Sequence, residues 1–251
     1  MKVPLTALII SKNNEDTIAR TLESLKDLAS ETVLVDEESQ DKTVLTAIMH
    51  GAKVYQKRFS DIGKQRAYGL RYVSNPWVLV LDSDEVVSKA LKKEIITVIK
   101  KDDKDFSAYE IPYLNHYLGK PLRRGGENYR MVRLFRARSL RIMPSIVHNK
   151  FVVKSGKTGK LKGILYHYSY RGIIQVFSKF TGYALKMAEV LAKKGERSSF
   201  RKILFYPLHM FYARFVKDGG YKDGLFRIPL DLAFAYMEFV TYLVLTFKKK
   251  R

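Results

Sequence analysis

Three carboxylates gather at the end of one apolar run in this sequence. The segment VLVLDSDEVV, residues 78–87, carries Asp82, Asp84 and Glu85 directly after four apolar residues. Like charges this close raise one another's pKa, so a cation is expected beside them. Mg²⁺ and Mn²⁺ prefer carboxylate oxygens and keep positions open for phosphate oxygens. The spacing therefore predicts a metal and phosphate site. The alternative is a solvated turn in which Ser88 caps the next helix.

The first hundred residues alternate between apolar runs and amphipathic segments. Apolar runs predict strands at 5–10, 32–36, 52–56 and 77–82, and the segments between them predict an amphipathic helix after the first strand and helices near 43–50 and 62–73. In the first helix Ile18, Leu22 and Leu25 share one face, and Asn13 or Asn14 is the expected cap. Short units of this kind indicate an α/β fold, a mostly parallel sheet with helices on both faces.

Two acidic residues come where predicted strands end. Asp36 ends the second strand and Asp82 the fourth. Ligands of open parallel sheets bind beyond the carboxyl ends of the strands, so we expect both aspartates at a binding edge. For Asp36 the alternative is that it caps the following helix.

The rest of the chain has a different composition. Short segments rich in tyrosine and arginine run from about 105 to 170, and a helical, basic and aromatic extension follows from 171. Residues 101–251 hold 31 basic and 11 acidic side chains, against 15 and 14 in residues 1–100. This imbalance predicts an anionic partner: nucleic acid, an acidic membrane surface, or an acidic or phosphorylated substrate.

Several classes of site and location are disfavoured by the sequence. The chain has no cysteine, which excludes disulfides and thiolate metal sites. SGKTGK, residues 155–160, lacks the first glycine of a P-loop, and no G-x-G-x-x-G follows the first strand. The N-terminal apolar run is only six residues long, too short for a signal peptide, so we expect a cytoplasmic protein.

The ordered motifs resemble a known enzyme family. LIISKNNEDTIARTLESL, VLVDEESQDKT, GKQRAYGLRYV and WVLVLDSDE, within residues 4–90, are together similar to the nucleotide-binding half of family 2 glycosyltransferases of the GT-A type. RLFR at 133–136, the segment 147–163 and HYSY at 167–170 resemble the bacterial branch that adds sugars to the inner core of lipopolysaccharide or lipooligosaccharide. The resemblance implies three parts: 1–104 binds the nucleotide-sugar, 105–170 binds the acceptor, and 171–251 associates with membrane or acceptor.

The resemblance also implies roles for individual residues. The donor-site residues are Ser11, Asn13 and Glu15 lining the nucleotide pocket, Asp36 accepting from a uridine-type base, Ser39 and Asp41 shaping its loop, and Lys64 and Arg66 near the diphosphate. Asp82 and Asp84 would be the D-x-D pair that holds Mn²⁺ or Mg²⁺, with Asp84 the principal ligand. Since imidazole is an acceptable ligand, His167 could complete the metal site; the alternative is a histidine packed among tyrosines. For Lys64 and Arg66 the alternative is a solvated helix face.

An inverting transferase needs a carboxylate that deprotonates the acceptor hydroxyl. Related core transferases have a His-Glu pair after the RLFR strand, but here the pair is His148-Asn149, and asparagine cannot act as a base. Our first candidate for the base is Glu127 in GGENYR. If no other acid has taken the role, the chain is a non-catalytic relative that binds donor or membrane.

The last apolar segment, 228–247, is followed by Lys248, Lys249, Lys250 and Arg251. Asp231 and Glu238 within it argue against a transmembrane span and favour a helix lying in the membrane interface; the alternative is a core-packing helix.

Taken together, these features lead us to expect a metal-dependent, inverting glycosyltransferase that is peripheral at the cytoplasmic membrane face. We expect it to move a sugar from a nucleotide-sugar, expected to be a UDP-sugar, to an anionic lipid-linked or lipopolysaccharide-core acceptor. A nucleic-acid-binding protein is a competing hypothesis, but the basic half has no recognisable motif for it.

Overall fold

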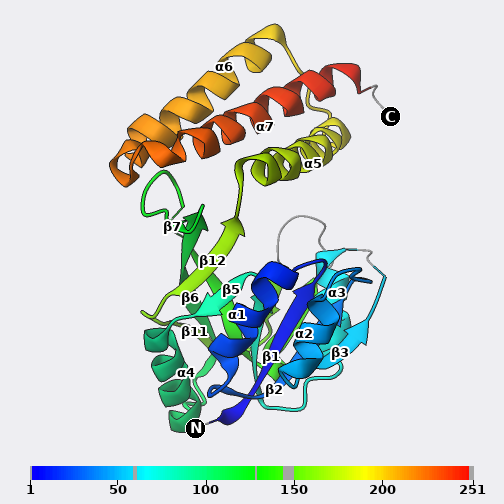
Figure 1. Ribbon diagram of the computed structural model, residues 1–251, viewed down its shortest axis with the longest axis vertical. Coiled ribbons are helices and arrows are strands. Elements are labelled where there is room, and N and C mark those ends of the chain that lie inside the picture. Colours follow the sequence, from blue (N-terminus) through cyan, green and yellow to red (C-terminus); the bar gives the residue numbers. More distant parts are fainter. Residues whose placement is uncertain (1, 59–60, 128, 144–149, 249–251) are drawn as a thin grey trace. The chain divides into compact units, whose positions relative to one another are not determined.

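Four apolar runs at the start of the chain form neighbouring parallel strands (Figure 1). The computed structural model describes residues 2–58, 61–127, 129–143 and 150–248. The strands are β1 (Val3–Ser11), β2 (Ala29–Asp36), β3 (Lys53–Gln56) and β4 (Trp77–Asp82), linked by α1 (Glu15–Leu25), α2 (Thr43–Met49) and α3 (Ile62–Leu70). They lie in the order β3-β2-β1-β4. The predicted strands and helices of this region are confirmed, with bounds that differ by a few residues.

Beyond β4 the sheet is mostly antiparallel, although β11 pairs in parallel with β6. The elements that follow are β5 (Glu85–Val87), α4 (Lys89–Lys101), β6 (Phe106–Tyr117), β7 (Lys120–Pro121), β8 (Arg130–Arg136), β9 (Leu140–Met143), β10 (Lys150–Val153), β11 (Lys157–Lys160) and β12 (Leu165–Tyr170). The order continues β8-β6-β12-β5, and β8 pairs antiparallel with both β4 and β6. β9 and β10 form a separate antiparallel pair.

Alternate residues of the strands enter two apolar layers, one on each face of the sheet. Leu5 and Ile9 of β1 pack with α1 and α4, whereas Leu8 packs with α3 and the β9–β10 pair. α3 approaches the sheet closely at Gly69, where a Cβ atom would lie 2.5 Å from a Leu8 methyl group. The predicted α/β fold with helices on both faces is therefore confirmed.

The described chain divides into two units. The first comprises Met1–Tyr113 and Tyr129–His167, and the second comprises Leu114–Asn128 and Tyr168–Arg251. The chain passes between the units three times: within β6, between residues 128 and 129, and within β12. The second unit contains three long helices: α5 (Ile173–Lys193), α6 (Phe200–Phe211) and α7 (Ile228–Phe247). A helical extension after residue 171 is thus confirmed, whereas the predicted division by function into 1–104, 105–170 and 171–251 stays a prediction.

Buried ion pairs hold the start of α7. Asp231 is fully buried, and it accepts hydrogen bonds from Arg227 Nε at 2.7 Å, Arg227 Nη2 at 3.0 Å and Arg214 Nε at 3.1 Å. Arg214 also pairs with Glu127. Gly125, at φ +68°, lies against the Arg227 guanidinium, where a Cβ atom would clash. An acid inside an apolar helix is stable here because two arginines neutralise it.

α7 packs against α5 and α6 on one side and leaves other apolar side chains exposed. The segment Leu225–Phe247 is long and apolar enough, by length and composition, to cross a membrane. In the apolar 18-residue window of this segment, 33% is buried. The core-packing alternative therefore describes one face of this helix. The hypothesis that the helix lies in a membrane interface is not tested by this packing.

Glu31 of β2 connects three segments of the first unit. Its carboxylate accepts hydrogen bonds from Lys53 Nζ of β3 at 2.8 Å, from Thr6 Oγ1 of β1 at 2.5 Å, and from Ser74 N at 3.0 Å and Ser74 Oγ at 2.9 Å. Burial alone raises its pKa, but these hydrogen bonds outweigh burial and lower the pKa of Glu31 to about 2. The ionised carboxylate thus stabilises the folded chain.

Glu31→Gln should lower the free energy of unfolding at neutral pH by about 2 kcal/mol. Because the folded pKa is depressed, this stabilisation is present above the ordinary pKa of 4.5 and is lost as pH falls toward about 2. Urea denaturation along a pH series should therefore show wild type and variant converging in acid. Glu23→Gln, at an exposed pair with Lys26, is the control and should have little effect at any pH. A constant difference across the series would contradict the assignment.

Candidate functional site

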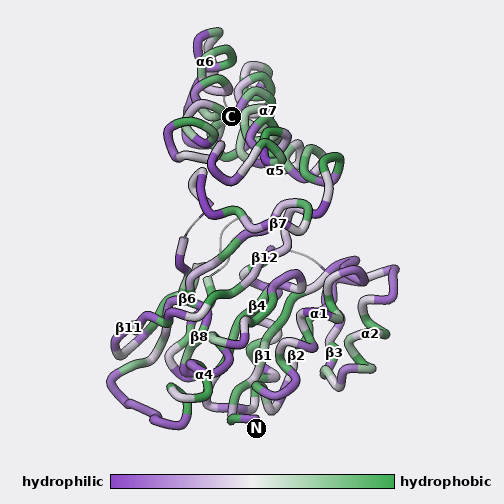
Figure 2. The backbone as a smooth tube through the Cα atoms, turned by 60° about the vertical axis from the view of Figure 1, so that its left-hand side comes forward, coloured by the Kyte–Doolittle hydropathy of each residue, from purple (hydrophilic) through white to green (hydrophobic). Residues whose placement is uncertain are grey.

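The carboxyl ends of three parallel strands meet at one edge of the first unit's sheet. Ser11 of β1 pairs in register with Asp36 of β2, and Ile10 pairs with Asp82 of β4. Figure 2 shows these apolar strands side by side. The two aspartates at predicted strand ends are therefore brought to the same edge.

Two loops at this edge are fastened to each other by hydrogen bonds. Asn13 donates from its backbone to Ser39 Oγ at 2.8 Å, and its side chain accepts from Gln40 N at 2.8 Å. Glu15 N donates to Asp41 Oδ2 at 3.0 Å. Asn13 has φ +49°, a left-handed conformation that asparagine adopts more readily than most residues. The residues predicted to line a nucleotide pocket thus form one connected loop structure.

Asp36 is fully buried beneath this loop. Its two carboxylate oxygens accept from Ser39 N at 2.8 Å and Ser39 Oγ at 2.6 Å. The residue that precedes α2 is Lys42, and no side chain caps that helix. The alternative that Asp36 caps α2 is therefore wrong, and Asp36 instead shapes the loop.

Two buried arginines hold Asp82. Arg66 of α3 pairs with Asp82 Oδ1, and Arg133 Nη2 of β8 lies 3.1 Å from Asp82 Oδ2. Arg66 is 1% exposed and Arg133 is 2% exposed, so the alternative that Arg66 lies on a solvated helix face is wrong. Burial alone raises the pKa of Asp82, but the two guanidinium groups outweigh it and hold that pKa below its usual range. Lys64, in contrast, is an exposed side chain 3.4 Å from Asp61 at the start of α3.

Arg133 also reaches the third carboxylate. Its Nη2 atom lies 2.8 Å from Oε1 of Glu85, which is fully buried and also accepts from Tyr113 Oη at 2.8 Å and Asp82 N at 2.9 Å. Burial raises the pKa of Glu85 to about 7, although Arg133 opposes that shift. The cation expected beside Asp82 and Glu85 is therefore supplied by the protein itself. Ser88 does cap α4, but the carboxylates before it do not form a solvated turn.

Asp84 faces a different partner. His167 Nε2, in the middle of β12, lies 3.4 Å from Asp84 Oδ1. Burial alone lowers the pKa of His167, but the Asp84 carboxylate outweighs it and raises that pKa. The His167 ring also packs edge-on against Tyr113, with centroids 5.9 Å apart. His167 therefore packs against a tyrosine and contacts one carboxylate of the D-x-D segment, and its role as a metal ligand stays a prediction.

A carboxylate oxygen and an imidazole nitrogen are acceptable ligands for Mn²⁺ or Mg²⁺. Among the described residues, no three His, Cys, Asp or Glu side chains gather as a metal cluster. The three predicted ligands, Asp82, Asp84 and His167, therefore do not converge on one metal position, because the Asp82 carboxylate pairs with Arg66 and Arg133. The donor set fits an ion that takes its other ligands from phosphate and water, which is usual for Mg²⁺ at phosphate sites.

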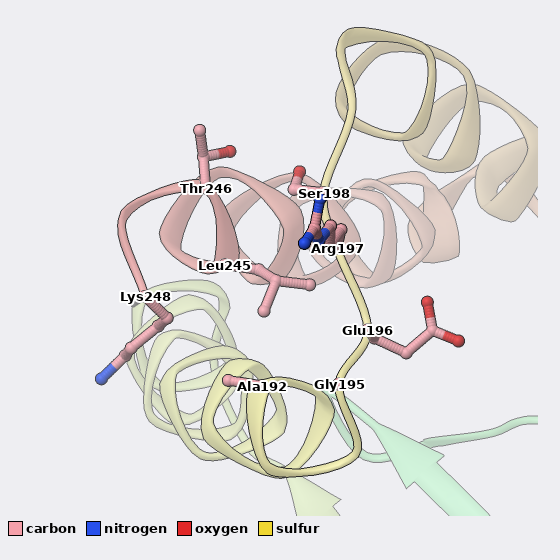
Figure 3. A pocket seen from close by; sticks show the side chains of 8 residues that line it. All are labelled: Ala192, Gly195, Glu196, Arg197, Ser198, Leu245, Thr246 and Lys248. Atoms are coloured by element: carbon pink, nitrogen blue, oxygen red, sulfur yellow. The ribbon is translucent and has the colours of Figure 1, made fainter. Parts of the chain in front are cut away.

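The predicted base lies elsewhere in the chain. Glu127 belongs to the second unit, is buried, pairs with Arg214, and accepts from Asn115 Nδ2 at 2.8 Å. His148 and Asn149 lie outside the described residues. A cavity of about 310 Å³, shown in Figure 3, is also in the second unit and is lined by none of the predicted site residues.

Sequence reasoning missed the roles of Arg133, Glu85 and Tyr113. Arg133 interrupts the apolar alternation of RMVRLFR in β8. A charged residue at a core-facing strand position indicates a buried ion pair, and the sequence of β8 contains this signal at Arg133.

Arg133→Gln should lower the free energy of unfolding by about 3 kcal/mol, because Glu85 would be left buried without its charge partner. The neighbouring exposed Arg138 supplies the control, and Arg138→Gln should change stability by less than about 0.5 kcal/mol. Chemical denaturation of both variants measures the difference. Equal stabilities would show that the Arg133 network does not hold the site.

The sequence matches known proteins over most of its length. Residues 6–158 match the family model described as "Glycosyl transferase family 2". An uncharacterized glycosyltransferase of Rickettsia prowazekii is 34% identical over 94% of this chain and 84% of its own length, and one of Rickettsia typhi is 33% identical over 84% and 77%. The lipopolysaccharide core biosynthesis glycosyltransferase LpsC of Rhizobium meliloti is 28% identical over 89% and 85%.

These matches cover both the sheet with its converging strand ends and much of the chain beyond it. They agree with the α/β architecture and with the motif order at the binding edge. The chain therefore belongs to glycosyltransferase family 2 and has its GT-A type fold.

Proposed function

We propose that this glycosyltransferase takes a sugar from a nucleotide-sugar, with Mn²⁺ or Mg²⁺ bound, and transfers it with inversion to a lipid-linked glycan. The observation that carries the proposal is the convergence of Ser11, Asp36 and Asp82 at one sheet edge, with the contact between Asp84 and His167 in the same unit. Ligands of open α/β sheets bind at such edges.

The base and ribose would lie on the loops built by Asn13, Glu15, Asp36, Ser39 and Asp41. Each oxygen of Asp36 accepts one hydrogen bond from Ser39, and a carboxylate oxygen can accept a second. A uridine-type base, which offers a ring N–H donor, would suit that acceptor once the loop above the buried Asp36 opens to admit it. This supports a UDP-sugar as the donor.

The diphosphate would lie near Arg66. Two nitrogens of its buried guanidinium, Nε and Nη1, have no hydrogen-bond partner among the described residues. A buried donor without an acceptor is costly, so an anion that accepts from it would be bound favourably. Lys64, exposed two residues earlier on α3, could add a further positive charge.

Asp84 and His167 would hold the divalent ion, which offsets the charge that develops on the departing nucleoside diphosphate. Asp82 would act differently from our expectation that it belongs to the metal site beside Asp84. Its oxygens are engaged by Arg66 and Arg133, so it would keep both guanidinium groups in position beside the phosphates.

Charge and similarity support the acceptor and the location that we propose. Residues 101–251 carry a net positive charge of 20, from 31 basic and 11 acidic residues, which suits a phosphorylated or acidic glycan at an anionic membrane surface. The similarity to LpsC, whose name states lipopolysaccharide core biosynthesis, supports a lipopolysaccharide-core acceptor. We place the enzyme at the cytoplasmic face of the membrane.

A thermal-shift panel of UDP, GDP, CMP and ADP, each with and without Mn²⁺, tests the donor site. We expect UDP with Mn²⁺ to raise the melting temperature by several degrees at about one hundred times its Kd. Asp84→Asn should abolish the part of the shift that depends on metal, whereas Asp27→Asn, at an exposed position in the same unit, should retain it. Stabilisation that is unchanged in Asp84→Asn would contradict the metal site. Nucleotide binding without sugar transfer to any acceptor would favour the non-catalytic alternative.

Glu127 has two possible roles that one pair of variants separates. A catalytic base should lose turnover by about 10² to 10⁴ in Glu127→Gln, with unchanged donor binding. We expect instead that Glu127→Gln lowers the melting temperature and leaves turnover of the folded enzyme intact, because Arg214 and Asn115 already engage both carboxylate oxygens.

Asp231→Asn removes another carboxylate that pairs with Arg214 and is the matched control for that loss of stability. Turnover lost in Glu127→Gln but kept in Asp231→Asn would establish Glu127 as the base and overturn the structural assignment.

A further inference from the structure

α6 has an unusual exposure pattern for a helix of a folded unit. None of its residues is buried, although it is rich in apolar side chains. Leu204, Phe205 and Leu208 are all exposed, and Tyr212 continues the series directly after the helix. Spacings of three and four residues place these side chains on one helical face. We call Leu204, Phe205, Leu208 and Tyr212 the α6 stripe.

α7 presents a second row of exposed apolar residues. Leu225 precedes the helix, and Leu232, Phe239, Leu243 and Phe247 follow at spacings of four and seven, which keeps them on one face. α6 and α7 pack against each other within the second unit, and their aromatic contact joins Tyr206 and Tyr242, with ring centroids 4.9 Å apart. Apolar surface of this extent marks a binding surface for a protein or a membrane.

The charge around these stripes is positive. Residues 168–248 carry 13 Lys and Arg against 6 Asp and Glu. Two of the six acids, Asp223 and Asp231, are already paired with the buried Arg227. The arginines that neutralise them, Arg227 and Arg214, belong to the same region, so its net charge stays at +7, the difference between 13 and 6, which matches an anionic layer and not a neutral apolar partner.

A cationic cavity lies at the ends of α5 and α7. Its volume is about 310 Å³, and Figure 3 shows its lining from both helix ends and the connecting segment, including Arg197, Ser198 and Lys248. Glu196 also lines it but pairs with Lys202 at 3.0 Å, and Lys248 Nζ lies 3.7 Å from Glu189 Oε1. The neighbours in sequence of these lining residues include Phe200 and Phe247, which are 77% and 79% exposed. Cationic groups beside exposed aromatic rings are typical of contact with lipid headgroups.

We propose that the second unit docks on an anionic phospholipid bilayer through the α6 stripe, with Arg197 and Lys248 contacting headgroup phosphates at the cavity. The inference rests on the proposed membrane location and identifies the part of the protein that would contact the membrane. It narrows our expectation from the sequence, which gave membrane or acceptor association to the whole extension 171–251 and an interfacial position to the segment 228–247. The rings and aliphatic side chains of the stripe would enter the outer part of the acyl layer, and α6 would lie along the membrane plane.

Vesicle co-sedimentation of the full chain tests this surface. Vesicles of phosphatidylcholine with phosphatidylglycerol should bind the protein in a salt-sensitive way, and vesicles of phosphatidylcholine alone should bind it at least tenfold more weakly. Phe205→Ser with Leu208→Ser should reduce binding at least tenfold. Ile48→Ser with Met49→Ser in α2 is the matched control, because those residues are 57% and 77% exposed, against 55% and 61% for Phe205 and Leu208.

A second pair of variants tests the cavity. Arg197→Gln with Lys248→Gln should remove most of the preference for phosphatidylglycerol, and Lys93→Gln with Lys100→Gln, at exposed positions of α4, should retain it. Unchanged binding of the α6 stripe variant would overturn the proposal, as would a wild-type chain that binds neither vesicle. Light scattering that shows a wild-type dimer and a monomeric stripe variant would assign the stripe to self-association instead.

The nucleotide and Mn²⁺ shift is measured on every preparation. Retained nucleotide stabilisation with no vesicle binding would overturn the docking surface alone. If nucleotide with Mn²⁺ does not raise the melting temperature of the wild type, the proposed donor site is overturned. The vesicle-binding result would then still test the docking surface.

Discussion

Buried charge that must be neutralised governs the binding edge of this protein. Arg66 and Arg133 are almost completely buried, and neither could remain there without carboxylates beside it. Asp82 and Glu85 meet that requirement, and in doing so they connect α3, β4, β5 and β8. Asp84 lies between Asp82 and Glu85 in sequence. The ion pairs of these two residues therefore also restrain the backbone of Asp84. The donor site that we propose depends on that neutralisation.

The same requirement appears in the second unit with a different outcome. Arg227 and Asp231 form a fully buried pair one turn apart, and Arg214 joins Asp231 to Glu127. In the first unit the arginines retain donors without partners among the described residues, as a binding site needs. In the second unit both carboxylate oxygens of Glu127 and of Asp231 accept hydrogen bonds, as a structural network needs.

The strands, their order and their carboxyl-end aspartates could be predicted from the sequence. Apolar runs of five or six residues identify β1, β2 and β4, and parallel strands bring Asp36 and Asp82 to one edge regardless of detail. The partners of Asp82 could not be predicted, because Arg133 reaches it only through the antiparallel pairing of β8 with β4, which no local pattern encodes. The partners of Asp231 could be predicted only in part, for a related reason. Arg227 lies four residues before Asp231, so helical spacing predicts that pair. Arg214 is 17 residues away and meets Asp231 only in the folded unit.

The long-range pairs of the second unit constrain the order in which the chain can fold as it is synthesised. Glu127 is separated by 87 residues from Arg214, and the Arg124 carbonyl by 103 residues from Arg227. The segment Leu114–Asn128 leaves the ribosome well before the helices that complete its unit. Contacts of such sequence separation form slowly, since the intervening loop must be closed first. The first unit can thus fold during translation, whereas the second must wait for the last helix, and its carboxylates stay solvated until then.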